Sequence, residues 1–243
     1  KDERGKQYEQ DLEKNSIYVV NKFHHESHRT GRCLVFITPN SERTMGTYLG
    51  ASEMLEFSMD FMDAVNNSKI LFTEGYQFTS DQNFKAFISV LENTDPNVQL
   101  ALSLSDPFVV SNFKSRFEDV FSKRIVDYVF CNKEEAIAMA GENFVEGLSR
   151  ISKNFVVTDG ANSSVISEEG NISEIEAHAV KAIDSNGAGD IYAGSVLHKI
   201  VQGKNFRKAC EFGNFASSII VQEKSPRLSV EGYKNLQKQF EHL

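Results

Sequence analysis

The stretch DSNGAGD, residues 184–190, contains the residues whose types and spacing could do chemistry. Gly187, Ala188 and Gly189 provide backbone with little side chain directly before an amphipathic run. The first turn of a helix has unpaired N–H groups and a partial positive charge, so a phosphate could come close to these amides. Asp190 adds a carboxylate that could accept the proton of an attacking hydroxyl. The stretch therefore predicts an anion-binding loop with an acid beside it.

Other interpretations of the glycines remain open. A dinucleotide-binding Gly-x-Gly-x-x-Gly would need glycine where Tyr192 stands, which weakens a nicotinamide dehydrogenase. A Walker-type loop would use Gly189 and Gly194 but needs lysine where Ser195 stands. A helix cap with close packing is the structural alternative, in which Asp190 only stabilises the helix dipole.

The loop lies in a chain whose strands and helices alternate. Crossover helices between strands give a mostly parallel sheet with helices on both faces. The sequence therefore predicts an α/β fold of three layers, α/β/α. The expected strands are 69–76, 98–106, 126–131, 154–160 and 163–170, and the expected helices are 1–15, 80–94, 107–123, 132–141, 187–202, 204–222 and 229–242.

The stretch near 16–50 breaks this alternation. Its segments 17–25, 32–39 and 44–50 are rich in β-branched and aromatic residues, which are typical of strands. We expect residues 20–49 to form part of a small β lid, which would close over a substrate and exclude water. The lid could also pair with a second copy of the chain. Residues 1–19 and 50–243 then form the main nucleotide-binding domain.

Three histidines, His24, His25 and His28, gather in this predicted lid. They could bind zinc, but the segment lacks a fourth ligand nearby, so a solvated polar flap is the favoured interpretation.

Composition limits the classes of partner and compartment. The chain has 243 residues and a net charge of −8, which disfavours broad attraction to nucleic acid or an anionic membrane. No apolar run approaches the roughly eighteen residues of a membrane span. Three widely spaced cysteines favour a reducing compartment, and we expect the cytoplasm. Because the sequence begins with Lys1 inside an expected helix, we also expect that an N-terminal part of the natural protein precedes it.

The string DSNGAGDIYAG resembles the signature Asp-Thr-x-Gly-Ala-Gly-Asp of the ribokinase-like (PfkB) family of sugar and nucleoside kinases. NKEE at 132–135 matches the family's Asn-x-x-Glu, and VTDGANSS at 157–164 lies where Thr-x-Gly-x-x-Gly is expected. FGNFASSIIVQEKSPRLS is similar to its C-terminal nucleotide-side helix and turn. The segments CLVFITPNSERTMGTYLGA, TEGYQF and LSLSDPFVV are closer to an adenosine-kinase-like bacterial branch than to ribokinase itself.

This resemblance implies a kinase that transfers the γ-phosphoryl group of ATP to a hydroxymethyl group of a nucleoside such as adenosine, or of a sugar. The implied cofactors are ATP and Mg²⁺. Asp190 would be the catalytic base, and Asn186, Gly187, Ala188 and Gly189 would form the anion hole. Residues typical of the family's sugar-binding part are not found, so a non-catalytic nucleotide-binding member or fragment is the alternative.

The resemblance also assigns residues to the nucleotide side. Asn132 and Glu135 would organise Mg²⁺ and phosphates through water, although the same spacing also fits a capping box. Thr158, Gly160 and Asn214 are expected near the nucleotide. The family often binds a monovalent cation near Asp184, but EKSPR at 223–227 departs from the usual Gly-Ala pattern, so K⁺ stays open.

Overall fold

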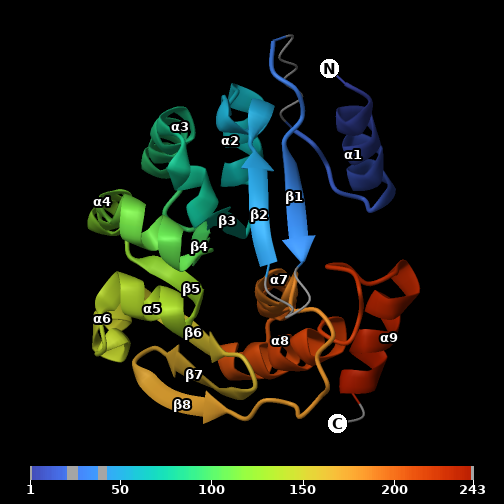
Figure 1. Cartoon of the computed structure of the whole chain (residues 1–243). Coiled ribbons are helices and arrows are strands. Elements are labelled where there is room, and N and C mark those ends of the chain that lie inside the picture. The colour runs from blue at the N-terminus through green and yellow to red at the C-terminus, as the bar shows by residue number, and fades with distance from the viewer. Residues whose placement is uncertain (1, 21–26, 38–42, 242–243) are drawn as a thin grey trace. The chain divides into compact units, whose positions relative to one another are not determined.

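The computed structural model describes residues 2–20, 27–37 and 43–241 (Figure 1). The chain forms two compact units: unit 1 comprises Lys1–Ser68 and Gln77–Val98, and unit 2 comprises Lys69–Tyr76 and Gln99–Leu243. Every residue to which the kinase resemblance assigns a role lies in unit 2. The predicted boundaries of lid and main domain stay a prediction.

Unit 1 consists of short helices and a strand pair. Its elements are α1 (Glu3–Lys14), β1 (Arg32–Ile37), β2 (Arg43–Tyr48), the 3₁₀ turn η1 (Gly50–Glu53), α2 (Met59–Asn66) and α3 (Asp81–Asn93). The expected helices 1–15 and 80–94 are confirmed, as are the strands expected within 32–39 and 44–50. The expected strand 17–25 is wrong for residues 17–20, which form none, and residues 21–25 lie outside the described part.

The helix α3 joins several segments of unit 1 through Asn83. The amide of Asn83 accepts a hydrogen bond from the N–H of Leu55 and donates to the carbonyl of Ser52, at 2.9 and 2.7 Å. The ring of Phe78 is fully buried and packs on Phe87. A buried amide that satisfies distant backbone groups fixes loops that contain little regular structure.

Of the three predicted lid histidines, His24 and His25 lie outside the described residues. His28 is described, and its Nδ1 lies 2.9 Å from the hydroxyl of Ser27. The interpretation of this segment as a polar flap therefore stays a prediction.

Unit 2 is built on a six-stranded sheet in the order β3-β4-β5-β6-β7-β8. The pairs from β3 to β6 are parallel, and β7 and β8 are antiparallel to their neighbours, which confirms the mostly parallel sheet. The elements are β3 (Ile70–Glu74), β4 (Gln99–Ser103), α4 (Pro107–Lys123), β5 (Val126–Asn132), α5 (Lys133–Ala140), α6 (Phe144–Ile151), β6 (Ser152–Asp159), β7 (Asn162–Glu168), β8 (Asn171–Ile175), α7 (Ala188–Val201), α8 (Phe206–Ile220) and α9 (Val230–Phe240), and the 3₁₀ turn η2 (Gly75–Thr79) follows β3.

Helices cover both faces of this sheet. On one face, Tyr128 and Phe130 of β5 pack with Tyr192 of α7 and Phe206 of α8. Helices α5 and α6 contact β5 and β6, and Figure 1 shows α4, α5 and α6 on the side opposite α7 and α8. Because β5 is covered on both faces, it is apolar almost throughout rather than alternating. The predicted three-layer α/β/α arrangement is confirmed.

The register of the parallel strands determines which side chains lie together at the carboxyl ends of the strands. Glu74 at the end of β3 pairs with Ser103 of β4, and Asn132 at the end of β5 pairs with Thr158 of β6. The carboxyl ends of four strands therefore meet at one edge of the sheet, where open α/β sheets bind ligands. No helix in the described part of the chain is long and apolar enough to cross a membrane.

Candidate active site

The glycine loop leads into α7 at this edge. Gly187 has φ +78° and ψ 0°, a left-handed conformation that glycine adopts without steric cost. A Cβ atom at this position would lie 2.6 Å from the carbonyl oxygen of Pro226. Both the backbone conformation and the close approach therefore require glycine here.

The first turn of α7 leaves amides available for an anion. The N–H groups of Gly189 and Asp190 have no acceptor among the described residues, and both residues are exposed. The N–H of Ala188 donates to the carbonyl of Ser185 at 3.3 Å. Because this hydrogen bond is long and therefore weak, the Ala188 amide is still partly available to an anion. The turn is thus open to solvent and offers uncharged donors.

Asp184 stabilises the glycine loop through hydrogen bonds. Its carboxylate accepts hydrogen bonds from the backbone N–H and the side-chain amide of Asn186, at 2.9 and 3.3 Å. The N–H groups of Ile183 and Asp184 donate to the carbonyl of Val221 beyond α8, at 2.7 and 3.1 Å. These bonds fix the loop against α8, and they turn the Asn186 amide toward Asp184.

Acidic side chains gather around Asp190. Burial raises the pKa of Glu74, and the negative charge of Asp190 raises it further. Burial also raises the pKa of Tyr76 to about 12, with further contributions from Asp106 and Glu135. Four carboxylates, from β3, the β4–α4 turn, α5 and α7, therefore lie close enough to the Tyr76 hydroxyl at the strand ends to raise its pKa.

The backbone after β3 and β4 is closely packed and includes an unfavourable φ angle. A Cβ atom on Gly75 would lie 2.6 Å from the carbonyl oxygen of Leu104. Ser105 has φ +74°, which is unfavourable for a residue other than glycine. Asp106 then caps α4 by accepting the N–H of Phe108 at 2.7 Å. Backbone strain of this kind concentrates at functional sites, where the surrounding structure maintains it.

Asn132 and Glu135 form the capping box that the sequence left as an alternative. The N–H of Glu135 donates to the side-chain oxygen of Asn132 at 2.8 Å, and the carboxylate of Glu135 accepts from the N–H and the amide of Asn132 at 3.1 and 2.7 Å. Burial raises the pKa of Glu135 to about 7, and the charges of Asp106 and Glu134 add to the effect. The capping box therefore places a carboxyl group that ionises near neutral pH at the edge of the site.

Thr158 and Gly160 lie on the neighbouring strand end. The hydroxyl of Thr158 donates to the carbonyl of Cys131 at 3.4 Å, beside Asn132. Gly160 has φ +57° in the turn between β6 and β7. The structure therefore brings Thr158 next to Asn132. That this strand edge faces a nucleotide stays a prediction.

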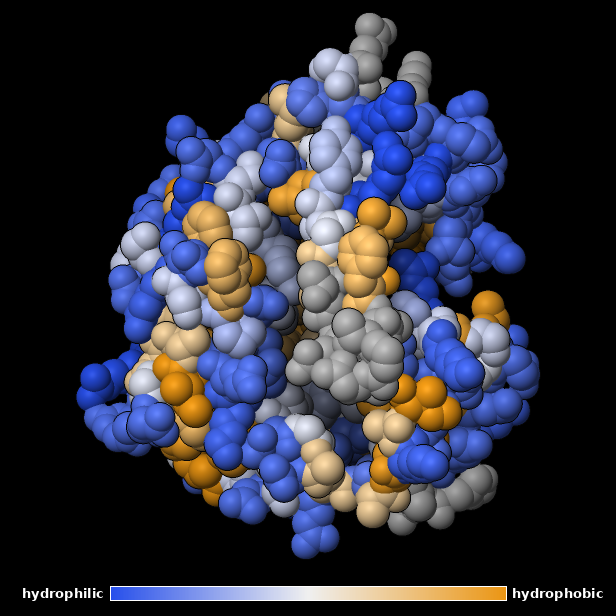
Figure 2. Space-filling view, in the orientation of Figure 1, coloured by the Kyte–Doolittle hydropathy of each residue, from blue (hydrophilic) through white to orange (hydrophobic). Residues whose placement is uncertain are grey.

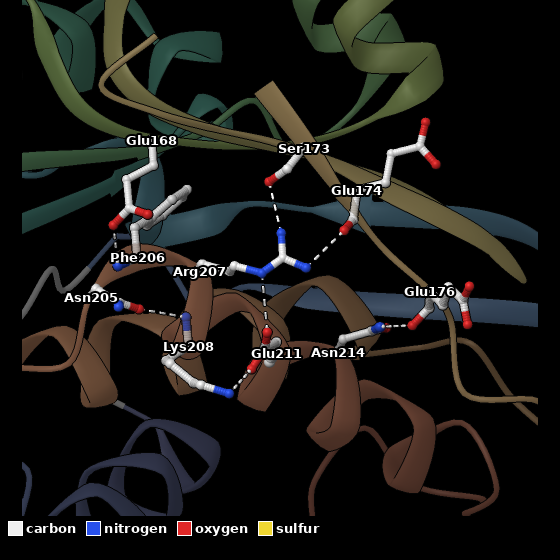
Figure 3. A network of polar contacts seen from close by, with 10 residues as sticks. All are labelled: Glu168, Ser173, Glu174, Glu176, Asn205, Phe206, Arg207, Lys208, Glu211 and Asn214. Carbon is white, nitrogen blue, oxygen red and sulfur yellow. Dashed lines mark hydrogen bonds and ion pairs between the residues drawn. The ribbon is translucent and has the colours of Figure 1, made fainter. Parts of the chain in front are cut away.

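Asn214 is buried in α8, where its amide donates to the carbonyl of Glu176 at 2.6 Å (Figure 3). Arg207 on the same helix donates to the hydroxyl of Ser173 and the carbonyl of Glu174, at 2.8 and 3.2 Å. These contacts hold β8 and the segment after it against α8. Asn214 therefore shapes the chain that follows β8, while a direct contact with a nucleotide stays a prediction.

Comparison with known proteins identifies the family. The model of the pfkB family carbohydrate kinases matches residues 1–232. The chain belongs to the pfkB family. It is 25% identical to adenosine kinase 1 of Arabidopsis thaliana over 91% of this chain and 70% of that protein. The crystal structure of adenosine kinase from Sinorhizobium meliloti matches with a TM-score of 0.88 and 27% identity, over 98% of this chain and 75% of that one.

The fold extends to ribokinase itself. Ribokinase from Thermotoga maritima matches with a TM-score of 0.78 and 20% identity, over 98% of this chain and 78% of that one. The resemblance to ribokinase-like kinases that the sequence carried is therefore confirmed. In six of the curated adenosine kinases that it matches, the chain spans 61–70% of their length.

Sequence reasoning assigned no role to Glu74, Tyr76 or Asp106. The segments TEGYQF and LSLSDPFVV, which contain these residues, served only as a sign of similarity to the adenosine-kinase-like branch of the family. A usable signal was present, because each segment places a polar side chain directly after an apolar strand. In a parallel sheet such residues share one edge.

Proposed function

We propose that the protein transfers the γ-phosphoryl group of ATP to a hydroxymethyl group of a nucleoside, with adenosine as the first candidate acceptor. The observation that carries the proposal is the pair of unpaired, exposed amides of Gly189 and Asp190 beside the carboxylate of Asp190. Membership of the pfkB family and similarity to adenosine kinases support the reaction type and the acceptor.

In the proposed reaction, the acceptor hydroxyl lies against Asp190. Its oxygen forms the new bond to the γ-phosphorus while the bond from that phosphorus to the β,γ-bridging oxygen breaks and ADP leaves. The hydroxyl proton passes to the Asp190 carboxylate. The amides of Gly189 and Asp190, with those of Gly187 and Ala188, hold the migrating group as its negative charge redistributes. Neutral donors suit a site that already contains several carboxylates.

Glu74 would take part in the same site. Its pKa is raised by burial and then by the negative charge of Asp190, so the two carboxylates lie close to each other. We therefore add Glu74 to the residues expected to contribute to the site.

The residues present fit a magnesium ion. Among the described residues, no three His, Cys, Asp or Glu side chains gather closely enough to hold a metal by themselves. Magnesium keeps several waters and binds few carboxylates, so a sparse arrangement with phosphates suits it. Glu135, with Asp106 near it, would hold the ion through water. When bound, the ion neutralises phosphate charge.

The nucleotide side is proposed on the same strand ends. Asn132, Thr158 and Gly160 would face the phosphates and ribose, while Asn214 would support the chain beside the base. K⁺ near Asp184 remains a proposal that rests on the family resemblance alone. The cytoplasmic location also remains a proposal, and it rests on the three widely spaced cysteines.

The test is ATP-dependent phosphorylation of a panel of nucleosides and sugars by the wild type, Asp190→Asn and Asp119→Asn. Asp119 is an exposed α4 carboxylate that pairs with Lys123, so it serves as a matched control. We expect adenosine to be the best acceptor and Asp190→Asn to lower turnover by at least ~10²-fold, as for loss of a general base. A wild type that binds ATP but phosphorylates no acceptor would instead support a non-catalytic binding protein.

A further inference from the structure

The glycine loop contains the only Asn-Gly pair of the sequence, Asn186–Gly187. Asparagine is a chemically labile residue, because the backbone nitrogen of the next residue can attack its side-chain carboxamide. Glycine in the following position has no side chain to hinder this attack. The proposed phosphoryl transfer gives the Asn186 side chain no chemical step, so its reactivity is a separate property of the loop.

The backbone nitrogen of Gly187 is available for the attack. Its N–H has no hydrogen-bond acceptor among the described residues, whereas the N–H of Ala188 donates to the carbonyl of Ser185. Asn186 and Gly187 are both partly exposed, so water can reach the pair. The structure therefore leaves both the nucleophile and the hydrolysing water accessible.

The pair Asn67–Ser68 provides the contrast within the same chain. The N–H of Ser68 donates to the carbonyl of Val65 at 3.0 Å, and the side-chain amide of Asn67 donates to the carbonyl of Asp63 at 2.7 Å. Both reacting groups are therefore occupied by hydrogen bonds, and the serine side chain adds steric hindrance. This pair should react much more slowly than the pair in the glycine loop.

We propose that Asn186 is a site of spontaneous deamidation that inactivates the glycine loop. In the first step the Gly187 nitrogen forms a bond to the side-chain carbonyl carbon of Asn186. The bond from that carbon to the side-chain nitrogen breaks, and the proton of the attacking nitrogen passes through water to the departing group, which leaves as ammonia. In the second step water opens the cyclic imide and leaves an aspartate or an isoaspartate at position 186. Water is the co-reactant, and no oxidation or reduction takes place.

An aspartate at position 186 would repel Asp184. The side-chain nitrogen of Asn186 donates to Oδ2 of Asp184 at 3.3 Å. Deamidation replaces this donor with a carboxylate oxygen, so two negative charges would face each other across a former hydrogen bond, which is unfavourable. The new charge would also lie next to the amides of Gly187 and Ala188, where the migrating phosphoryl group is proposed to bind.

An isoaspartate would change the backbone instead, because it adds one carbon atom to the main chain directly before Gly187. Gly187 already has φ +78°, and a Cβ atom on it would lie 2.6 Å from the carbonyl oxygen of Pro226. A longer main chain cannot be accommodated against Pro226 without displacing the loop. Both products should therefore impair the site. This consequence rests on the proposed function, whereas the deamidation itself does not.

The experiment incubates the wild-type protein in mildly alkaline buffer and locates deamidation by peptide mass mapping. We expect Asn186 to be modified while Asn67 in the same sample stays largely intact. The reaction should accelerate with rising pH, because the Gly187 nitrogen must lose its proton. Asn186→Gln should show no modification at this position, since glutamine would have to form a larger ring. Asn67→Gln is the matched control and should leave the reaction at Asn186 unchanged.

The modified form can then be isolated and compared with the intact form. It has one more negative charge, and hydrophilic residues cover most of the face shown in Figure 2, so anion exchange should separate the two forms. We expect the modified form to have a lower melting temperature and a turnover at least ~10-fold lower, as for loss of an anion-hole donor.

Mass mapping and melting temperature do not depend on kinase activity, so they decide the proposal even if the proposed function fails. Asn186 that deamidates no faster than Asn67 overturns the proposal. A modified form with the melting temperature of the intact protein, or with its turnover, also overturns it.

Discussion

The site depends on one glycine at the entrance of α7 for two separate reasons. Gly187 has a positive φ, and its α-carbon faces the Pro226 carbonyl with no space for a methyl group. Gly189, two residues on, has neither constraint, since a Cβ there meets nothing within 4 Å. The two glycines therefore differ: backbone geometry requires Gly187, whereas Gly189 leaves open space at the proposed anion site.

This difference gives a matched pair of variants. We expect Gly187→Ala to destabilise the protein by about 1–3 kcal/mol, because strain and the Pro226 contact add. Gly189→Ala should leave stability within about 0.5 kcal/mol of the wild type. Urea unfolding of both variants measures the difference. Equal stability of the two would contradict the geometry described for the loop.

Glu135 predicts a pH dependence of stability. Its pKa is raised from 4.5 to about 7 in the folded protein, so the folded state binds the proton more tightly than the unfolded state. The resulting stabilisation is complete below pH 4.5 and is lost as the pH rises through about 7. The loss is at most about 3 kcal/mol. Glu135→Gln should remove it.

The measurement is denaturant unfolding of wild type and Glu135→Gln between about pH 5 and pH 8, a window that brackets the raised pKa. The wild type should lose about 2–3 kcal/mol more than the variant across this range. The quantity compared is the change of the unfolding free energy with pH. Its absolute value is not compared, because the substitution also changes the hydrogen bonds to Asn132. Parallel pH profiles would show that the Glu135 carboxyl is not perturbed.

At the scale of elements, a buried lysine links the three C-terminal helices. Lys199 of α7 is only 5% exposed. Its ammonium lies 4.4 Å from the ring centroid of Phe212 on α8 and 5.9 Å from that of Phe240 on α9. The two rings also contact each other, with their centroids 5.0 Å apart. Cation–π attraction compensates the desolvated charge and attaches α9 to α7 and α8.

A double-mutant cycle of Lys199→Met and Phe212→Leu tests this contact. We expect a favourable coupling energy of about 0.5–2 kcal/mol, so that Phe212→Leu costs less when Lys199 is already replaced by methionine. Unfolding free energies of the four proteins give the coupling. Additive effects would show that the lysine and the ring do not stabilise each other.

At the scale of the whole molecule, the predicted association of two copies through the lid remains to be tested. The β1–β2 pair exposes Val35 and Met45 on the face opposite Arg32, at 44% and 59%. Exposed apolar strands with unpaired edges tend to pair with another chain. Sedimentation should show a dimer that Val35→Lys weakens, while Ile172→Lys, at an exposed apolar position of β8, should not. A monomer at all concentrations would rule out this association.

Most regular elements could be predicted because their signals are local. Pro107 at the first turn of α4 and Asn132 at the cap of α5 mark helix starts within a few residues. The elements left out, α2, α6 and β8, have eight, eight and five residues. Segments this short contain too little periodicity to stand out from a loop, and their stability comes from packing.

The sequence by itself determined the glycine loop, Asp190 and the family, because a motif needs only the order and spacing of neighbouring residues. Only the tertiary structure decided that Glu74 and Asp106 lie at the same strand ends as Asp190. These residues are distant in the chain, and the register of the parallel strands brings them together. Long-range proximity depends on the packing of the whole chain, which no short pattern specifies.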